Sequence, residues 1–220
     1  MAVILIVAIL IIDQAAKLWV KTSMSLSENI HITDWFYIYF IENNGMAYGM
    51  QIGSKLALSL FRVVAIALLA YYIWRQVHKP DAKWGYIVCL SLILAGAAGN
   101  LIDCMFYGLC FDASTFHSVS HYVGFGNGYA PFLMGKVVDM LYFPLIDTTY
   151  PEWFPWWGGE RFIFFSPIFN IADSSISVGV AAILFFYHKE ISRISLKEGQ
   201  AVETQGDGHT EEAQKAEEAK

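Results

Sequence analysis

Four long runs of apolar residues divide the chain, and polar segments separate them. At about 1.5 Å per residue, a helix of such length crosses the roughly 30 Å of hydrocarbon in a bilayer. The first run has neither a basic leader nor a small-residue cleavage site, so we expect a retained helix rather than a signal peptide. The pattern therefore predicts four transmembrane helices, over about residues 2–20, 56–74, 84–103 and 162–187.

The polar segments between the runs carry strand and turn signals. Residues 30–41 are rich in β-branched and aromatic side chains, and residues 135–143 form a second strand-like stretch. The long segment 104–161 is rich in glycine and aromatics, and its part from Glu152 to Gly159 is typical of an interfacial aromatic belt. The expected fold is an all-α membrane protein of four helices with a small extracytoplasmic β-sheet and a long extracytoplasmic loop, over residues 1–190.

The distribution of basic residues predicts how the chain is oriented in the membrane. A short loop between the second and third runs carries three of them, and three more follow the last run. Because cytoplasmic loops are enriched in Lys and Arg, both regions and both termini are expected in the cytoplasm, and residues 21–55 and 104–161 on the outer face. These basic residues are Arg75, Lys79, Lys83, Lys189, Arg193 and Lys197.

Composition supports a membrane protein and excludes other classes. The chain is 56% hydrophobic and 15% charged, with a mean hydropathy of +0.44. Residues 198–220 carry seven acids and two lysines, so they account for most of the net charge of −6. We expect residues 191–220 to be a disordered cytoplasmic tail. The near-neutral remainder predicts no nucleic-acid partner, and the spacing of the three cysteines predicts no metal site.

Four aspartates lie in or beside the apolar runs, although a charged Asp at a helix centre costs roughly 2.5–3.5 kcal/mol. In the expected topology they share one depth, toward the outer face. Polar neighbours at helical spacing accompany them: Lys17 follows Asp13 by four residues, and an Asn precedes two others by three. Small residues at 95–99 would let the third helix approach its neighbours closely. The four are Asp13, Asp103, Asp139 and Asp173.

Several hypotheses account for such carboxylates. Two of them in a low-dielectric site would share a proton, as aspartic proteases require. Intramembrane carboxylates also mark proton- or ion-coupled transporters, and a scaffold protein could use them for structure alone. Asp13 and Lys17 favour a structural ion pair, Asp103 could be a hydrogen-bonded helix-end residue, and Asp173 favours a functional role because the run around it is apolar.

Five short segments match, in order, the motifs of a known family. The first is Asp13 to Lys17, with the pattern D-Q-x-x-K, and the last is Phe169 to Asp173, with the pattern F-N-x-A-D. Between them lie residues 43–49, 96–103 and 135–139. Each motif is weak alone, but all five together are specific. The chain therefore resembles the lipoprotein signal peptidases (signal peptidase II) over about residues 1–190.

The resemblance implies a membrane aspartyl endopeptidase without metal or cofactor, in which Asp139 and Asp173 form the catalytic dyad. Its substrates would be prolipoproteins whose Cys carries diacylglycerol, cut just before that Cys, with membrane lipid as the other partner. A monomer in the bacterial cytoplasmic (inner) membrane is expected, with the site toward the outer face. The residues expected to line and brace the site are Asp13, Lys17, Asn43, Gly45, Asn100, Asp103 and Asn170.

Two features depart from the family pattern. The family has Arg directly after the Asp of the third motif, whereas this chain has Cys104. Lys17, Lys136 and Arg161 are candidates for supplying the missing positive charge. The outer segment 104–138 is also longer than the family requires. Cys104 and Cys110 could form a disulfide or remain two thiols.

Overall fold

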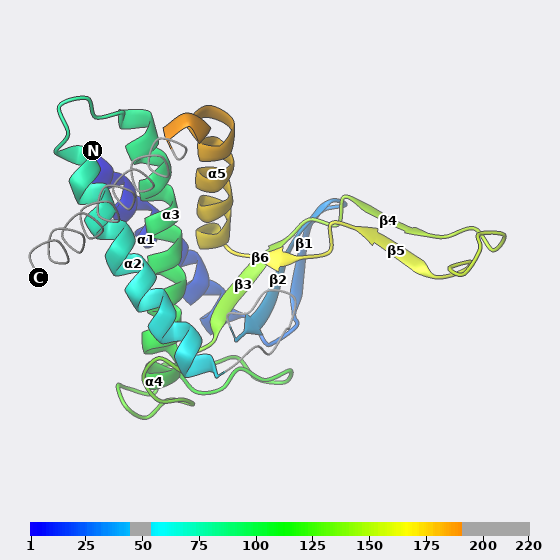
Figure 1. Ribbon diagram of the computed structural model, residues 1–220. Helices are drawn as coiled ribbons and strands as arrows, with labels where there is room; N and C mark the ends of the chain where they lie inside the picture. Colours follow the sequence, from blue (N-terminus) through cyan, green and yellow to red (C-terminus); the bar gives the residue numbers. More distant parts are fainter. Residues whose placement is uncertain (45–53, 191–220) are drawn as a thin grey trace, which may run out of the picture. The chain divides into compact units, whose positions relative to one another are not determined.

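The computed structural model describes residues 1–44 and 54–190. The chain forms two compact units, residues 1–180 and 181–220, and helix α5 continues from the first unit into the second. In the described residues, three helices are long and apolar enough to cross a membrane (Figure 1). They are α1 (Ala2–Ser23), α2 (Lys55–Val77) and the stretch Trp84–Cys110, which comprises α3 (Trp84–Ile102), the π-helical η2 (Asp103–Tyr107) and α4 (Gly108–Cys110).

The three long helices confirm the first three predicted runs. They turn apolar side chains outward: Ile4 of α1 is 74% exposed and Leu68 of α2 is 64% exposed. A helix in water would bury such side chains, whereas hydrocarbon accepts them. Helix α2 begins after Ser54, whose hydroxyl accepts a hydrogen bond from the Ala57 amide at 3.1 Å. Helix α3 packs against both α1 and α2.

The fourth predicted span is wrong in its first part. Residues 162–164 belong to a strand, and helix α5 covers only Ile171–Phe186, which makes it shorter than a typical spanning helix. The apolar run misled the prediction because a strand and a buried helix can share the same hydrophobicity. The strand β6 (Ile168–Phe169) ends the extended segment just before α5 begins.

The extended segments pair into two antiparallel sheets. In the four-stranded sheet the order is β1-β2-β3-β6, with β1 at Asn29–Thr33, β2 at Phe36–Asn43 and β3 at Val137–Tyr142. In the two-stranded sheet, β4 (Ile146–Thr149) pairs with β5 (Arg161–Phe164).

The sheets correct the expected all-α class, because strand pairing satisfies backbone groups in both of the segments 21–55 and 104–161. They confirm a small sheet and the strand at 135–143. The single strand expected at 30–41 is two strands that turn at Asp34 and Trp35.

A small hydrophobic core joins the end of α1 to the four-stranded sheet. Val20 of α1 and Met24, the residue after this helix, pack with Phe40 of β2 and with Val138 and Met140 of β3, and all five are buried. An irregularity in the pairing of β2 with β3 lies between Ile38 and Ile41, beside this core. The core fixes β3, the strand that carries Asp139, against the helices.

Beside this core, a buried ion pair joins α1 to β2. The ammonium of Lys21 lies 2.6 Å from Glu42 and 3.0 Å from the hydroxyl of Ser114. Lys136 reaches the other oxygen of Glu42 at 3.2 Å. Burial raises the pKa of Glu42, but Lys21, Ser114 and Lys136 together hold that pKa below its ordinary value. Four segments that are distant in sequence therefore meet at one carboxylate.

Replacing Glu42 by Gln should lower the free energy of unfolding by about 3–5 kcal/mol, because it leaves the Lys21 ammonium buried without its carboxylate. Thermal unfolding in detergent micelles measures the change. The double variant Lys21→Met/Glu42→Leu should recover much of the loss, because it removes both charges. Equal stability of Glu42→Gln and wild type would show that the buried Lys21 ammonium does not need the Glu42 carboxylate.

Candidate active site

A buried lysine lies between two buried aspartates at the centre of the helices. Lys17 of α1 has no exposed side-chain surface, and its ammonium lies 2.9 Å from Asp13 and 2.9 Å from Asp103. The expected pairing of Asp13 with Lys17 is confirmed, and Asp103 joins it from the end of α3. Two carboxylates around one ammonium bind α1 to α3 at this level.

The same aspartates position the two segments that follow. Asp13 accepts a hydrogen bond at 2.9 Å from the amide of Ala172, in the first turn of α5, where unpaired amides favour an anion. Asp103 accepts one at 3.3 Å from the amide of Val138 in β3. The Lys17 cluster thus fixes both the start of α5, which carries Asp173, and the strand that carries Asp139.

Gln14 and Tyr107 complete the Lys17 cluster. The Gln14 amide donates to Asp103 at 2.9 Å and to Asp13 at 3.2 Å, while its oxygen accepts from the Tyr107 hydroxyl at 3.1 Å. The sequence interpretation did not assign either residue a role. Gln14 lies inside the first motif, whereas nothing local distinguishes Tyr107 from the many other aromatics.

Two asparagines connect the Lys17 cluster to the remaining aspartates. Asn100 accepts from Lys17 at 2.9 Å and donates to Asp173 at 2.8 Å. Asn170 donates to Asp139 at 2.7 Å and to the Asn100 oxygen at 3.0 Å, and its own oxygen accepts from the Asp173 amide at 2.8 Å. Asn170 therefore connects the carboxylate of Asp139 to the backbone of Asp173.

Asp139 and Asp173 differ in their surroundings. Asp139 is 1% exposed, and its second oxygen accepts from Asn43 at 2.6 Å, whereas Asp173 is half-buried. Burial and the nearby Asp173 charge raise the pKa of Asp139 to about 7, although hydrogen bonds from Asn43 and Asn170 oppose the rise. A carboxyl group that gains or loses its proton near neutral pH is suited to acid–base chemistry.

Glycines on α3 allow this close packing. A Cβ at Gly99 would lie 2.7 Å from the Asp13 carboxylate, and one at Gly96 would overlap the carbonyl oxygen of Ala172. The prediction that small residues bring the third helix close to its neighbours is confirmed. Larger side chains at these positions would push α5 away from the Lys17 cluster.

The expected site residues within the described segments all join one connected network. They are Asp13, Lys17, Asn43, Asn100, Asp103, Asp139, Asn170 and Asp173. Gly45 lies outside the described residues. A structural role for Asp13, Lys17 and Asp103 follows from their mutual pairing.

A positive charge reaches Cys104 from a residue that the sequence interpretation did not consider. The guanidinium of Arg62 in α2 lies 3.5 Å from the Cys104 sulfur. Of the three expected candidates, Lys17 contacts Asp103, Lys136 contacts Glu42 and Arg161 pairs with Asp147. Cys89, Cys104 and Cys110 all lie in described segments and carry free thiols.

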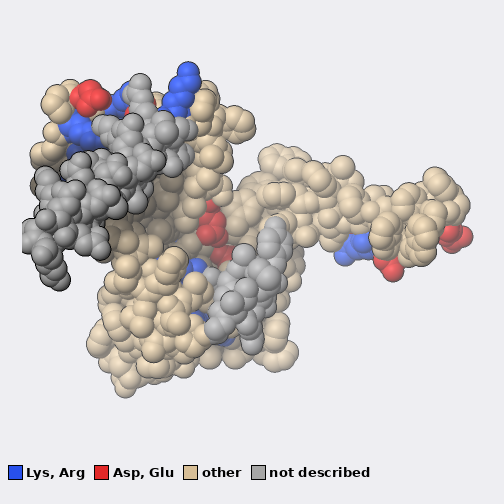
Figure 2. All heavy atoms as spheres, in the orientation of Figure 1, with Lys and Arg blue, Asp and Glu red and all other residues tan. Residues whose placement is uncertain are grey.

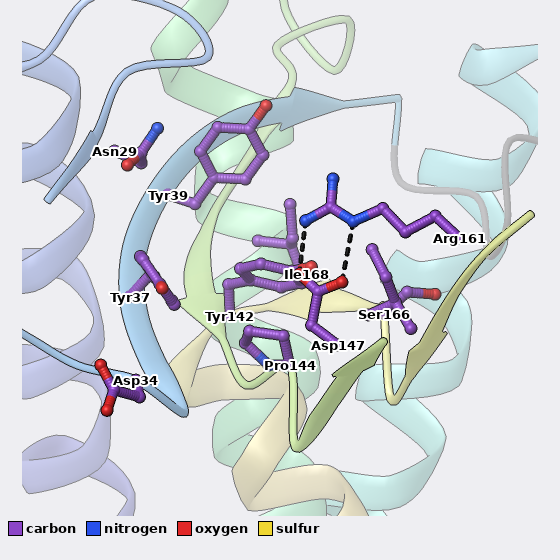
Figure 3. A pocket seen from close by; sticks show the side chains of 11 residues that line it. Asn29, Asp34, Tyr37, Tyr39, Tyr142, Pro144, Asp147, Arg161, Ser166 and Ile168 are labelled. Atoms are coloured by element: carbon purple, nitrogen blue, oxygen red, sulfur yellow. Dashed lines mark hydrogen bonds and ion pairs between the residues drawn. The ribbon is translucent and has the colours of Figure 1, made fainter. Parts of the chain in front are cut away.

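A separate cavity of about 490 Å³ lies between the four-stranded sheet and the β4–β5 hairpin (Figure 3). Tyr37, Tyr39 and Tyr142 line it, and so do Asp147 and Arg161, which form an ion pair. Side chains alternate along a strand, so Tyr142 points to the opposite face of β3 from Asp139. This cavity is therefore distinct from the aspartate network.

Apolar helices of membrane-spanning length around a buried network of carboxylates and amides define a membrane protein with an acidic site. The family model described as signal peptidase (SPase) II matches residues 5–189. The chain therefore belongs to the signal peptidase II family and is a peptidase.

Individual relatives agree with this assignment. A lipoprotein signal peptidase of Porphyromonas gingivalis is 47% identical, and the match covers 86% of this chain and 83% of that protein. One from Amoebophilus asiaticus is 36% identical, covering 79% and 72%. A solved bacterial membrane enzyme has a TM-score of 0.58 at 25% identity, covering 87% of this chain and 90% of its own, and a second, at 24% identity, has a TM-score of 0.55.

The raised pKa of Asp139 predicts a pH-dependent stability. Folded Asp139 binds its proton more tightly than unfolded Asp139, so this group makes stability fall as the pH rises from about 4 to about 7. The Asp139→Asn variant has no carboxyl group at this position, so it lacks this contribution to the pH dependence of stability. The melting temperature of this variant, relative to that of wild type, should therefore increase over this pH range. A constant difference between the two proteins would show that the pKa of Asp139 is not raised.

Proposed function

We propose that this chain is an aspartic endopeptidase that removes the signal peptide from prolipoproteins whose Cys carries diacylglycerol, cutting just before that Cys. The observation that carries the proposal is the bridge made by Asn170. Its amide nitrogen donates to Asp139 and its oxygen accepts from the amide of Asp173. One side chain thereby contacts both the Asp139 carboxylate on β3 and the backbone of Asp173 at the start of α5.

The chemistry follows from the different environments of the two acids. Burial favours the protonated form of Asp139, and a protonated carboxyl group can donate to the carbonyl oxygen of the scissile bond. The Asp173 carboxylate then takes a proton from water as the water oxygen attacks the carbonyl carbon. Transfer of that proton to the departing amine breaks the C–N bond, and a hydroxyl group of the intermediate returns its proton to Asp139. A carboxylic acid and an amine are released and the dyad is restored, so the reaction requires no metal or cofactor.

The Lys17 cluster supports this chemistry without contacting the substrate. Its positive charge reaches Asp173 through Asn100, since the Asn100 oxygen accepts from Lys17 and its nitrogen donates to Asp173. This arrangement gives the Asp173 carboxylate a fixed hydrogen-bond donor and connects it to Lys17. Lys17, Asp13 and Asp103 are therefore positioning residues, and Asn43, Asn100 and Asn170 line the site.

The substrate class follows from the family and from the membrane setting. The name shared by the relatives from Porphyromonas gingivalis and Amoebophilus asiaticus, lipoprotein signal peptidase, indicates lipoprotein substrates. A lipid-bearing Cys lies at the membrane surface, and its acyl chains can bind through apolar contacts worth about 0.8 kcal/mol per buried CH₂. The enzyme would act as a monomer in the bacterial inner membrane, with its site toward the outer face and both termini in the cytoplasm. Membership of a peptidase family argues against the transporter hypothesis.

Asp139→Asn or Asp173→Asn should lower the rate of cleavage by at least about 10³-fold, because each removes a group that transfers a proton in the reaction. A gel-shift assay on a purified diacylglyceryl-modified precursor measures the rate. Asp147→Asn is the matched control, because Asp147 lies on the β4–β5 hairpin and is expected to retain full activity. Full activity of either dyad variant, with its fold intact, would disprove the proposed mechanism.

The rate should show a bell-shaped dependence on pH, because activity needs one proton on the pair. The Asn43 hydrogen bond lowers the pKa of Asp139, so Asn43→Ala should shift the upper limb of the profile to higher pH. Single-turnover cleavage across the pH range checks the shift. An unchanged upper limb would show that loss of the Asp139 proton does not set it.

A further inference from the structure

The β4–β5 hairpin carries a cluster of aromatic side chains at its far end. We call β4, β5 and the connecting residues 150–160 the aromatic arm. The arm forms a two-stranded sheet separate from the four-stranded one (Figure 1). Such a ribbon is marginally stable in water by itself, so its surroundings matter for its stability.

The end of the arm is internally packed. The ring of Tyr150 stacks on Phe154 at 5.0 Å and contacts Phe162 at 5.2 Å. The Tyr150 amide donates to the Glu160 carbonyl at 2.9 Å, and the Gly159 amide donates to the Tyr150 carbonyl at 3.0 Å. The connection is therefore a built platform that can hold other side chains in fixed positions.

Two tryptophans are displayed by this platform. Trp153 is 79% exposed and Trp156 is 89% exposed. The backbone of Trp156 has a φ of 68°, a conformation that is unfavourable for a bulky residue. A turn that keeps an almost fully exposed Trp in this conformation points to a use for the side chain outside the protein.

The charges of the arm are arranged to suit a membrane surface. Arg161 and Asp147 neutralise each other where the strands pair, and Glu152 and Glu160 flank the tryptophans. Figure 2 shows the rest of this face of the arm as uncharged. Trp is enriched at the membrane–water boundary because its ring is apolar and its N–H polar. The two glutamates would keep insertion shallow, at the depth of the lipid headgroups.

The connection of the arm to the fold indicates that the bilayer is its partner. Strand β5 ends at Phe164, strand β6 follows at Ile168–Phe169, and the apolar helix α5 begins at Ile171. Strand β6 also pairs with β3 beside Leu141 and Tyr142. The root of the arm is therefore a few residues from the end of an apolar helix, and its tip can reach about 20 Å away at about 3.3 Å per residue.

We infer that the aromatic arm is a membrane-surface anchor, which inserts Trp153 and Trp156 into the interface of the bilayer beside the helices. Anchoring would hold β6 and, through it, β3 at a constant height above the lipid. This role is independent of the peptidase chemistry, because it requires only that the protein lies in a bilayer.

An environment-sensitive fluorophore at position 156 tests the anchor. The full chain, with Cys89, Cys104 and Cys110 replaced by Ser, receives Trp156→Cys and is labelled with a nitrobenzoxadiazole probe. The labelled protein is placed in nanodiscs of phosphatidylethanolamine and phosphatidylglycerol. We expect a blue-shifted emission, several-fold stronger quenching by nitroxide-bearing lipids than at a control site, and weak quenching by iodide. The control is Ser118→Cys, exposed on the outer segment 104–138.

Emission typical of water at position 156, with strong iodide quenching and no effect of nitroxide lipids, would overturn the inference. The same result would follow if the arm bound a protein partner instead. Trp153→Cys in the same background gives a second reading at a different position on the tip. If the fluorophore at both positions shows the emission and quenching typical of water, while the nanodisc-embedded protein keeps a wild-type melting temperature, the arm is not a lipid anchor.

Discussion

A fully buried ammonium is the interaction on which the rest of the site depends. Lys17 lies within 2.9 Å of both Asp13 and Asp103, and water has no access to it. Removing charges from water is costly unless they are closely paired and hydrogen-bonded. The two carboxylate oxygens that Lys17 does not contact accept hydrogen bonds from the Ala172 amide and from Gln14, and the Val138 amide donates to the Asp103 oxygen that Lys17 contacts. The charge cluster is thereby coupled to backbone positions rather than to side chains alone.

This coupling explains how two acids on different kinds of secondary structure come together. Asp139 lies on a strand and Asp173 on a helix, and both elements are fixed to the Lys17 cluster through main-chain hydrogen bonds. Main-chain contacts place an element regardless of its side chains, so the strand and the helix can each present one carboxyl group. Asn170 then sets the two groups relative to each other.

A second buried centre follows the same principle. Glu42 contacts Lys21, Ser114 and Lys136, as Lys17 contacts its two aspartates. The first centre joins helices to the site, and the second joins β2 and the segment 104–138 to the end of α1. Between the two lies the small core around Phe40 and Met140. Buried ion pairs are weak sources of stability but strong determinants of which segments can be neighbours.

The sequence by itself determined the solvent and the chemistry of this protein. Apolar runs longer than 18 residues require a bilayer, and aspartates placed beside those runs with Asn and Lys at helical spacing required internal partners, which the structure shows. The motifs were sufficient for the family. Local patterns could not separate Phe162 to Phe164 from the helix α5, because a short apolar stretch suits a strand and a helix equally well.

Only the tertiary structure decided which polar groups meet across long separations. Asn100 lies 73 residues from Asp173, and Asn43 lies 96 residues from Asp139. Arg62 reached Cys104, and Tyr107 reached Gln14, although neither pair shares a local pattern. Such contacts depend on how closely α3 approaches its neighbours, which Gly96 and Gly99 permit. Spacing along one helix records which residues share a face, whereas partners on other elements are fixed only when the chain packs.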